Sequence, residues 1–325
     1  MLEGVAPHVD GGGRRLHLDS MTAHTPYPRL LAVAIVACGC APTATPAPAP
    51  QNPSPMVETT RRHERVPQAA PAGVRLEVRA GLGAPVRVFV PDAALDADTL
   101  RLLVHFHGAP HVAEHAVARA SRPWLLAVVN LGAGSSRYER PFRDPALLEA
   151  LRGAVLAGVA EALGREVRAA TTVLSGFSAG CGAVRGVLST PEGRAGVTAV
   201  LLLDGVHTGY APPGRVLHEG GALETERLAG LLAFARAAAA GEKAMLVTHS
   251  AIFPGTYAST TETADWLLER LALERDAVLA WGPVGMQRLS EARRGRFLLY
   301  GFAGNTAPDH IDHLHGLAAF LEDLP

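Results

Sequence analysis

Short apolar runs alternate with longer helical patterns along the chain after residue 73, and this alternation constrains the fold more than any other feature. Continuous apolar runs of this length are typical of strands that are buried on both faces. The runs lie at 102–106, 125–129, 171–175, 199–203, 244–248 and 297–301. Helical patterns lie near 145–164, 180–189, 223–239, 261–274 and 312–323. The alternation predicts an α/β fold in which helices cover both faces of a mostly parallel, twisted sheet.

A hairpin pattern precedes this alternating region. Apolar residues occupy every second position in residues 74–78 and again in residues 86–90, with Gly81 and Gly83 between the two stretches. Period-two alternation around a glycine-containing turn predicts an antiparallel N-terminal hairpin at the start of the sheet.

Composition excludes several classes of protein. Hydrophobic residues make up 48% of the 325-residue chain, which is enough for a large packed core, and the formal net charge of -1 favours no nucleic-acid partner. The cysteines are Cys38, Cys40 and Cys181, so no disulfide framework is expected inside a folded domain.

The N-terminal region has the pattern of an export signal. Residues 29–40 (RLLAVAIVACGC) contain a positive charge, an apolar run too short to span a bilayer, and small residues before cysteine. The segment resembles a bacterial lipoprotein signal in which Ile35 to Cys38 form the lipobox and Cys38 is lipidated. That resemblance implies a lipid-anchored protein at the bacterial cell envelope. A plain cleaved signal, giving a periplasmic or secreted protein, is the alternative.

The composition divides the chain into four regions. Residues 1–20 are polar and aperiodic, which indicates a non-structural extension or a true start at Met21. Residues 21–40 contain the signal. Residues 41–72 are rich in Pro, Ala and Thr, which is typical of an extended linker. Residues 73–325 form the predicted folded domain.

The most specific motif follows the apolar run that ends at Ser175. Gly176-Phe-Ser178-Ala-Gly180 matches G-x-S-x-G between a predicted strand and a predicted helix. Such a turn holds the serine in a strained conformation above the sheet, and both glycines are required because neighbouring backbone comes close. We therefore predict that Ser178 is a nucleophile.

In this setting the sequence resembles the α/β-hydrolase family over about residues 73–325. The resemblance implies the α/β-hydrolase fold, a Ser–acid–His triad in that order, and acyl-transfer chemistry without a cofactor. It also implies an oxyanion hole made by the N–H of Ala179 and by an N–H of the turn after His107, from Gly108 or Ala109.

Two acids compete for the second position of the triad. Asp204 directly follows the apolar run 199–203, at the sheet edge expected for the Ser178 turn. The family more often places its acid one strand later, where Glu262 is the first carboxylate. We favour Asp204 and keep Glu262 as its rival.

The base is expected after the last apolar run. His310, His313 and His315 follow it, and His310 lies nearest the predicted loop-to-helix junction where the family places its base. We favour His310, with His313 second.

The sequence thus predicts an exported serine hydrolase that cleaves a small carboxylic ester by a Ser178–Asp204–His310 triad. The oligomeric state stays open. Two alternatives remain: a non-catalytic surface lipoprotein that binds a ligand or partner on the same scaffold, and a metal-dependent hydrolase that uses the clustered histidines.

Overall fold

The computed structural model describes residues 66–324. The predicted extension (1–20), the signal with Cys38 (21–40) and residues 41–65 of the linker lie outside the described residues, so export and lipidation stay predictions. Within residues 66–324, no helix is both long and apolar enough to cross a bilayer.

The described residues are built around a ten-stranded sheet with the order β1-β2-β4-β3-β5-β6-β9-β12-β11-β10. The predicted apolar runs form its six parallel strands: β3 (Thr99–Phe106), β4 (Trp124–Val129), β5 (Arg168–Phe177), β6 (Ala199–Leu203), β9 (Ala244–His249) and β12 (Phe297–Phe302). The predicted N-terminal hairpin is present as β1 (Gly73–Val78) and β2 (Val86–Pro91), paired antiparallel with Val74 opposite Val90. This mixed sheet confirms the predicted fold class, the α/β-hydrolase fold.

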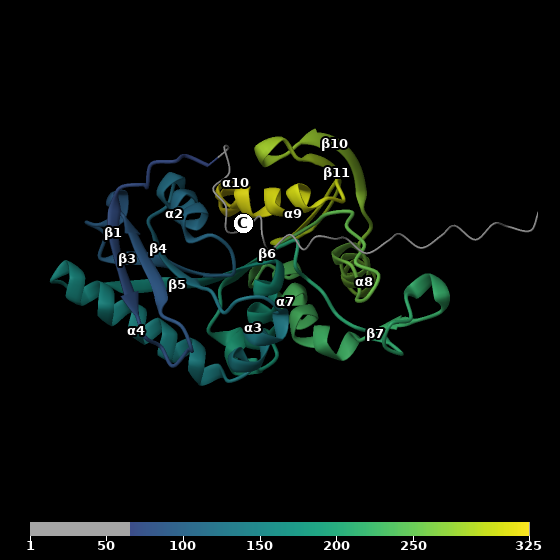
Figure 1. Cartoon of the computed structure of the whole chain (residues 1–325), viewed down its shortest axis with the longest axis horizontal. Coiled ribbons are helices and arrows are strands. Elements are labelled where there is room, and N and C mark those ends of the chain that lie inside the picture. The colour runs from purple at the N-terminus through teal and green to yellow at the C-terminus, as the bar shows by residue number, and fades with distance from the viewer. Residues whose placement is uncertain (1–65, 325) are drawn as a thin grey trace, which may run out of the picture. The chain divides into compact units, whose positions relative to one another are not determined.

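Helices cover both faces of the sheet (Figure 1). The helices are α2 (Pro110–Arg119), α3 (Ser135–Phe142), α4 (Pro145–Leu163), α5 (Cys181–Leu188), α6 (Pro191–Ala195), α7 (Ala229–Ala239), α8 (Thr260–Leu271), α9 (Ala307–His315) and α10 (Leu317–Asp323). In Figure 1, α2, α9 and α10 lie on one side of the sheet and α3, α4 and α7 on the other. Short 3₁₀ turns complete the elements: η1 (Asp92–Ala94), η2 (Ser178–Gly180), η3 (Leu217–Glu219), η4 (Thr225–Leu228) and η5 (Pro283–Gly285).

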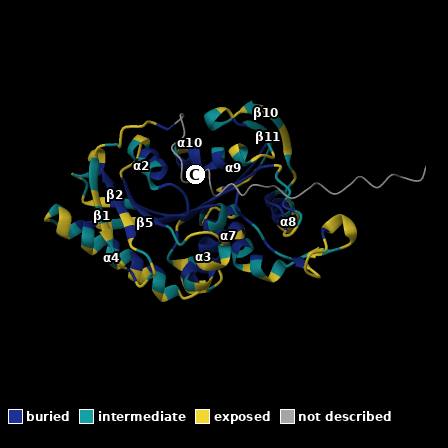
Figure 2. Ribbon diagram, viewed as in Figure 1, coloured by how far each residue is buried: buried dark blue, intermediate teal, exposed yellow. Residues whose placement is uncertain are grey.

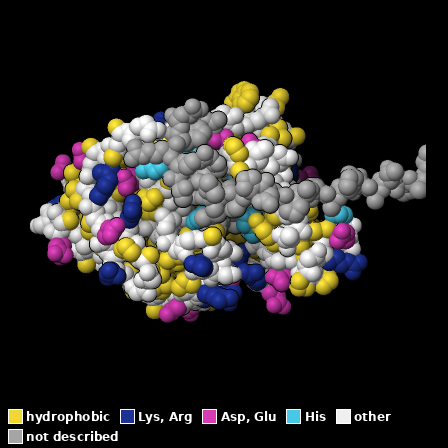
Figure 3. Space-filling model, viewed as in Figure 1, with side chains coloured by type: hydrophobic (Ala, Val, Ile, Leu, Met, Phe, Trp, Pro, Cys, Tyr) yellow, Lys and Arg dark blue, Asp and Glu magenta, His cyan; other side chains and the backbone are white. Residues whose placement is uncertain are grey.

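The apolar runs have no polar alternation because both of their faces are packed. Along β3, Leu102 and Val104 pack into the core beneath α4, α5 and α7, whereas Leu103 packs against α2 and α10 on the opposite face. Figure 2 shows the central strands buried and the outward faces of the surrounding helices exposed. Basic and acidic side chains are interspersed on the face shown in Figure 3, in keeping with the near-zero net charge.

Two predicted helix boundaries were wrong, and two strands were missed. The helix predicted from 223 begins only at Ala229, because residues 222–228 form the short strand β8 (Ala222–Leu223), paired with β7 (Tyr210–Ala211), and then η4. The last helix begins at Ala307 rather than 312, where Thr306 caps it by accepting from the N–H of Asp309, and it divides into α9 and α10. The pattern also missed the antiparallel strands β10 (Asp276–Trp281) and β11 (Gln287–Arg294). β11 carries no apolar run, and the short apolar run of β10 has Leu279 and Trp281 exposed.

Candidate active site

The G-x-S-x-G motif forms a sharp turn between a strand and a helix. β5 ends at Phe177, and Ser178 follows with φ of +50°, a left-handed conformation that is strained for a residue with a side chain. The turn η2 leads directly into α5. Ser178 is half-buried and lines a pocket, so its hydroxyl is accessible from that pocket.

The two glycines of the motif are required by close backbone contacts. A Cβ atom on Gly180 would lie 1.9 Å from the carbonyl oxygen of Phe106 in β3, and one on Gly176 would lie 2.7 Å from the backbone nitrogen of Cys181. Real Cβ atoms do not come this close to backbone, so the tight turn exists only because both positions lack a side chain.

A single methyl group at Gly180 should therefore disturb the fold. We expect Gly180→Ala to lower the free energy of unfolding by about 1–3 kcal/mol, because β3 or the turn must shift. The matched control is Gly153→Ala on α4, where the added Cβ meets nothing within 4 Å and helix propensity should raise stability by about 0.5–1 kcal/mol. Urea unfolding measures both, and equal effects of the two variants would show that the contact at Gly180 has no energetic importance.

Asp204 and His310 form a buried hydrogen-bonded pair. Asp204 follows β6, His310 lies in the first turns of α9, and the His310 Nδ1 lies 2.7 Å from the Asp204 Oδ2. A carboxylate only accepts, so Nδ1 carries the proton and Nε2 is left with a free lone pair. This pair joins two residues that are 106 positions apart in the sequence.

Ser250 and Thr260 hold the Asp204 carboxylate in place. Ser250 donates its N–H to Oδ1 at 2.9 Å and its hydroxyl to Oδ2 at 2.7 Å, while the Thr260 hydroxyl donates to Oδ1 at 2.6 Å. Sequence reasoning missed both residues. The available signal was the position of Ser250 directly after β9, at the same edge of the sheet as Asp204 after the neighbouring strand β6.

The surroundings of Asp204 keep it ionised. Burial by itself would raise its pKa, but the charges of His313 and His310 and the hydrogen bonds from His310 and Thr260 outweigh burial and hold the pKa well below its usual value. An ionised carboxylate at this position can stabilise the positive charge that an imidazole acquires when it takes a proton during a reaction.

The pair lies against the serine turn. The His310 ring packs on the ring of Phe177, the residue before Ser178, with 4.7 Å between centroids. On the other side, a Cβ atom on Gly205, next to Asp204, would lie 2.3 Å from the carbonyl oxygen of Ser178. Residues from β5, β6 and α9 are thus brought together at the carboxyl edge of the sheet.

The rival acid and the rival bases have other hydrogen-bond or ion-pair partners. The Glu262 carboxylate belongs to the capping box of α8 and accepts from Ser259 and from the hydroxyl of Tyr210. His313 is fully buried, and its Nδ1 lies 2.7 Å from the Thr248 hydroxyl. His315 Nδ1 lies 3.9 Å from Asp312. Of the candidates, it is Asp204 and His310 that the structure brings together.

The turn after β3 lies beside the serine turn. Its hydrogen bonds indicate which of its backbone N–H groups is available to form the predicted oxyanion hole. The N–H of Gly108 donates to the side-chain oxygen of Asn130 at 3.1 Å, and the Asn130 amide donates back to the Gly108 carbonyl at 3.0 Å. The N–H of Gly108 is therefore already engaged, which leaves Ala109, at the start of α2, as the candidate donor of this turn. Ala179, the other predicted donor, lines the same pocket as Ser178.

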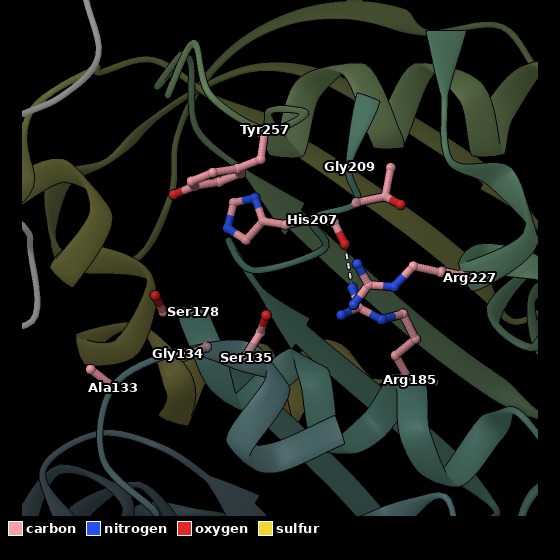
Figure 4. A pocket seen from close by; sticks show the side chains of 11 residues that line it. Ala133, Gly134, Ser135, Ser178, Arg185, His207, Gly209, Arg227 and Tyr257 are labelled. Carbon is pink, nitrogen blue, oxygen red and sulfur yellow. Dashed lines mark hydrogen bonds between the residues drawn. The ribbon is translucent and has the colours of Figure 1, made fainter. Parts of the chain in front are cut away.

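A pocket of about 410 Å³ opens over Ser178 (Figure 4). The residues that line it come from the start of α3 and the loop before it, the serine turn, α5, the segment after β6, η4 and the segment before α8: Ala133, Gly134, Ser135, Ser178, Ala179, Arg185, His207, Thr208, Gly209, Arg227 and Tyr257. The loop between β4 and α3 contributes Ala133 and Gly134.

Three further reactive side chains near the serine turn contact neighbouring residues of the fold: Cys181, His105 and His107. Burial raises the pKa of the Cys181 thiol, which packs in the core and contacts the Gly176 carbonyl. His105 lies 3.1 Å from the Ser175 hydroxyl and His107 lies 2.8 Å from that of Tyr138. Among residues 66–324, no three His, Cys, Asp or Glu side chains gather as a metal site would require.

No protein-family model matches the chain, and no curated protein matches it. Solved structures with a similar fold include a feruloyl esterase module from Clostridium thermocellum (10% identity, 80% of this chain and 92% of that chain, TM-score 0.46). They also include an esterase from Pyrobaculum calidifontis (15%, 83% and 87%, TM-score 0.45) and one from Thermogutta terrifontis (17%, 79% and 96%, TM-score 0.45). At such identities these likenesses concern the fold alone, and the fold of this chain is defined by its own sheet order.

Proposed function

We propose that the protein is a serine hydrolase that cleaves a carboxylic ester through an acyl-enzyme intermediate on Ser178. The observation that carries the proposal is the Asp204–His310 pair, packed against a strained serine turn that opens into a pocket. A buried carboxylate, an imidazole that it orients and an accessible serine are the three groups that this chemistry requires.

The reaction follows from these groups. His310 Nε2 takes the proton of the Ser178 hydroxyl while its oxygen bonds to the ester carbonyl carbon, and Asp204 stabilises the imidazolium that forms. The tetrahedral intermediate then expels the alcohol, which leaves with the proton from His310. Water attacks the acyl-enzyme by the same route, releasing the carboxylic acid and restoring the Ser178 hydroxyl.

The developing oxyanion needs donors that are fixed in advance. We propose the backbone N–H groups of Ala179 and Ala109, since the N–H of Gly108 is engaged by Asn130. Such donors act in a site shielded from bulk water, where each contributes more than it would in solvent.

Covalent labelling tests the proposal. A fluorophosphonate probe should label the wild-type chain, and Ser178→Ala should abolish the labelling. Ser175→Ala is the matched control, because Ser175 lies three positions earlier in the same segment but is fully buried within β5. Its replacement should leave the labelling intact.

The same assay discriminates the non-catalytic alternative. A well-folded wild-type chain that takes up no label and hydrolyses no p-nitrophenyl ester of any acyl length would be a binding protein on a hydrolase scaffold. Labelling that persists in Ser178→Ala would assign the nucleophile to another residue.

A further inference from the structure

The pocket over Ser178 has a positively charged wall. Arg185 from α5 and Arg227 from η4 both line it, and Figure 4 shows their guanidinium groups side by side on the wall across from Ser178. None of the described residues that line the pocket is acidic. A pocket that bound only an apolar group would not be expected to have two guanidinium groups in its wall.

Both arginines are fixed by one buried carboxylate behind the wall. Arg185 is nearly buried and donates Nε and Nη2 to Glu139 Oε2, with Nη1 on the His207 carbonyl. Arg227 donates Nη2 to the same Glu139 oxygen at 2.6 Å and keeps 35% of its side chain exposed. The guanidinium groups are thus pre-positioned, and that of Arg227 remains partly open to the pocket.

The local charges do not balance. Arg143 also binds Glu139, so three guanidinium groups surround it, and a second carboxylate, that of Glu224, lies 3.6 Å from Arg227. Three positive charges against two negative charges leave a net charge of +1 among these five described residues. The nearby His207 adds none, because burial lowers its pKa to about 4 and it is neutral at pH 7.

His207 contributes a hydrogen-bond acceptor to this wall. Its Nδ1 lies 3.3 Å from the Ala258 carbonyl, so Nδ1 carries the proton and Nε2 is an acceptor. Its ring packs edge-on against Tyr257, with 5.0 Å between centroids. The cationic donors of this wall suit an anionic group rather than an alkyl chain, whereas His207 Nε2 can only accept from a donor group of the ligand.

We propose that this pocket recognises a carboxylate carried by the ester substrate, bound by Arg227 with Arg185 behind it. The inference rests on the proposed function, since it names the substrate class of the same site. The carboxylate can belong to the acyl part, as in a monoester of a dicarboxylic acid, or to the alcohol part, as in an acylated hydroxy acid. Both sources present the same anion to the same guanidinium wall.

Two matched substrate pairs separate these sources. Monophenyl adipate against the phenyl ester of adipic acid monoamide tests the acyl part, and 4-acetoxybenzoate against 4-acetoxybenzamide tests the alcohol part. We expect wild type to prefer the charged member of one pair by about tenfold in kcat/KM, the size of a hydrogen-bonded charge interaction. Arg227→Gln should bring that ratio close to one, and Arg227→Lys should restore part of it.

Arg236→Gln on α7 is the control, because Arg236 is exposed and does not line the pocket. The ratio of kcat/KM between the charged and the neutral ester should be the same in this variant as in wild type. Hydrolysis of the neutral esters without a charged preference in either pair, or a preference that survives Arg227→Gln, overturns the inference and leaves the proposed function standing. No hydrolysis of any of the four esters and no fluorophosphonate labelling would overturn both.

Discussion

Replacing either partner of the Asp204–His310 pair should lower kcat for ester hydrolysis by about 10⁴-fold, with little loss of binding. In Asp204→Asn the amide can place its NH₂ group against Nδ1, which would force the His310 proton onto Nε2 and remove the base. In His310→Gln no base remains. Steady-state kinetics on a p-nitrophenyl ester measure both variants.

The rival residues are the matched controls. Glu262→Gln removes only a carboxylate of the α8 capping box, at a cost of about 1 kcal/mol in stability. His313→Gln changes a buried side chain whose Nδ1 partner is Thr248. Both variants should keep most of the activity of wild type. Loss of activity in Glu262→Gln with retention in Asp204→Asn would reject the assigned acid, and the reverse pattern for the two histidines would reject the assigned base.

Glu139→Gln should destabilise the fold by about 3 kcal/mol at pH 7, because it leaves three guanidinium groups around a buried neutral amide. Burial alone would raise the pKa of Glu139, but the hydrogen bonds and charge of Arg185, with Arg143 and Arg227, lower it to about 2. The folded-state pKa therefore lies below the unfolded one. The stabilisation from this group is fully present above about pH 4.5 and is lost as the pH falls toward 2.

Urea unfolding of wild type and Glu139→Gln between pH 7 and pH 3 tests this expectation. The quantity compared is the difference in the free energy of unfolding between the two proteins. The difference should shrink as the pH falls. Glu149→Gln is the control, since the Glu149 side chain is 59% exposed and its ion pair with Arg152 should contribute no more than about 0.5 kcal/mol. Equal costs for the two variants, or a Glu139 effect that does not change with pH, would show that the buried cluster does not stabilise the fold.

The position of the proposed acid, Asp204, has a structural reason. Asp204 follows β6, and the end of the neighbouring strand β9 supplies Ser250, whose N–H and hydroxyl both bind the Asp204 carboxylate. The two strands thus have complementary roles, since β6 carries the charge and β9 carries the donors that orient it. Asp204 has a φ of +40°, which aspartate tolerates better than most residues.

Contiguous residues alone predicted the parallel sheet, the N-terminal hairpin and the serine turn. The six apolar runs became the parallel strands because a strand packed on both faces needs apolar side chains at every position. The turn at Ser178 was visible because its geometry depends on two glycines at fixed spacing within five residues. The antiparallel strands β10 and β11 were missed, because β11 carries no apolar run and the short apolar run of β10 lies exposed at the edge of the sheet.

That Asp204 pairs with His310, whereas Glu262 and His313 have other hydrogen-bond partners, is visible only in the tertiary structure. His310 and His313 lie three residues apart on α9, and which of them meets Asp204 depends on how that helix is rotated against the sheet. The same holds for Arg185, Arg227 and Glu139, which come from three separate elements. Local sequence determines backbone geometry over a few residues, whereas the distance between side chains far apart in the chain is set by the packing of whole elements.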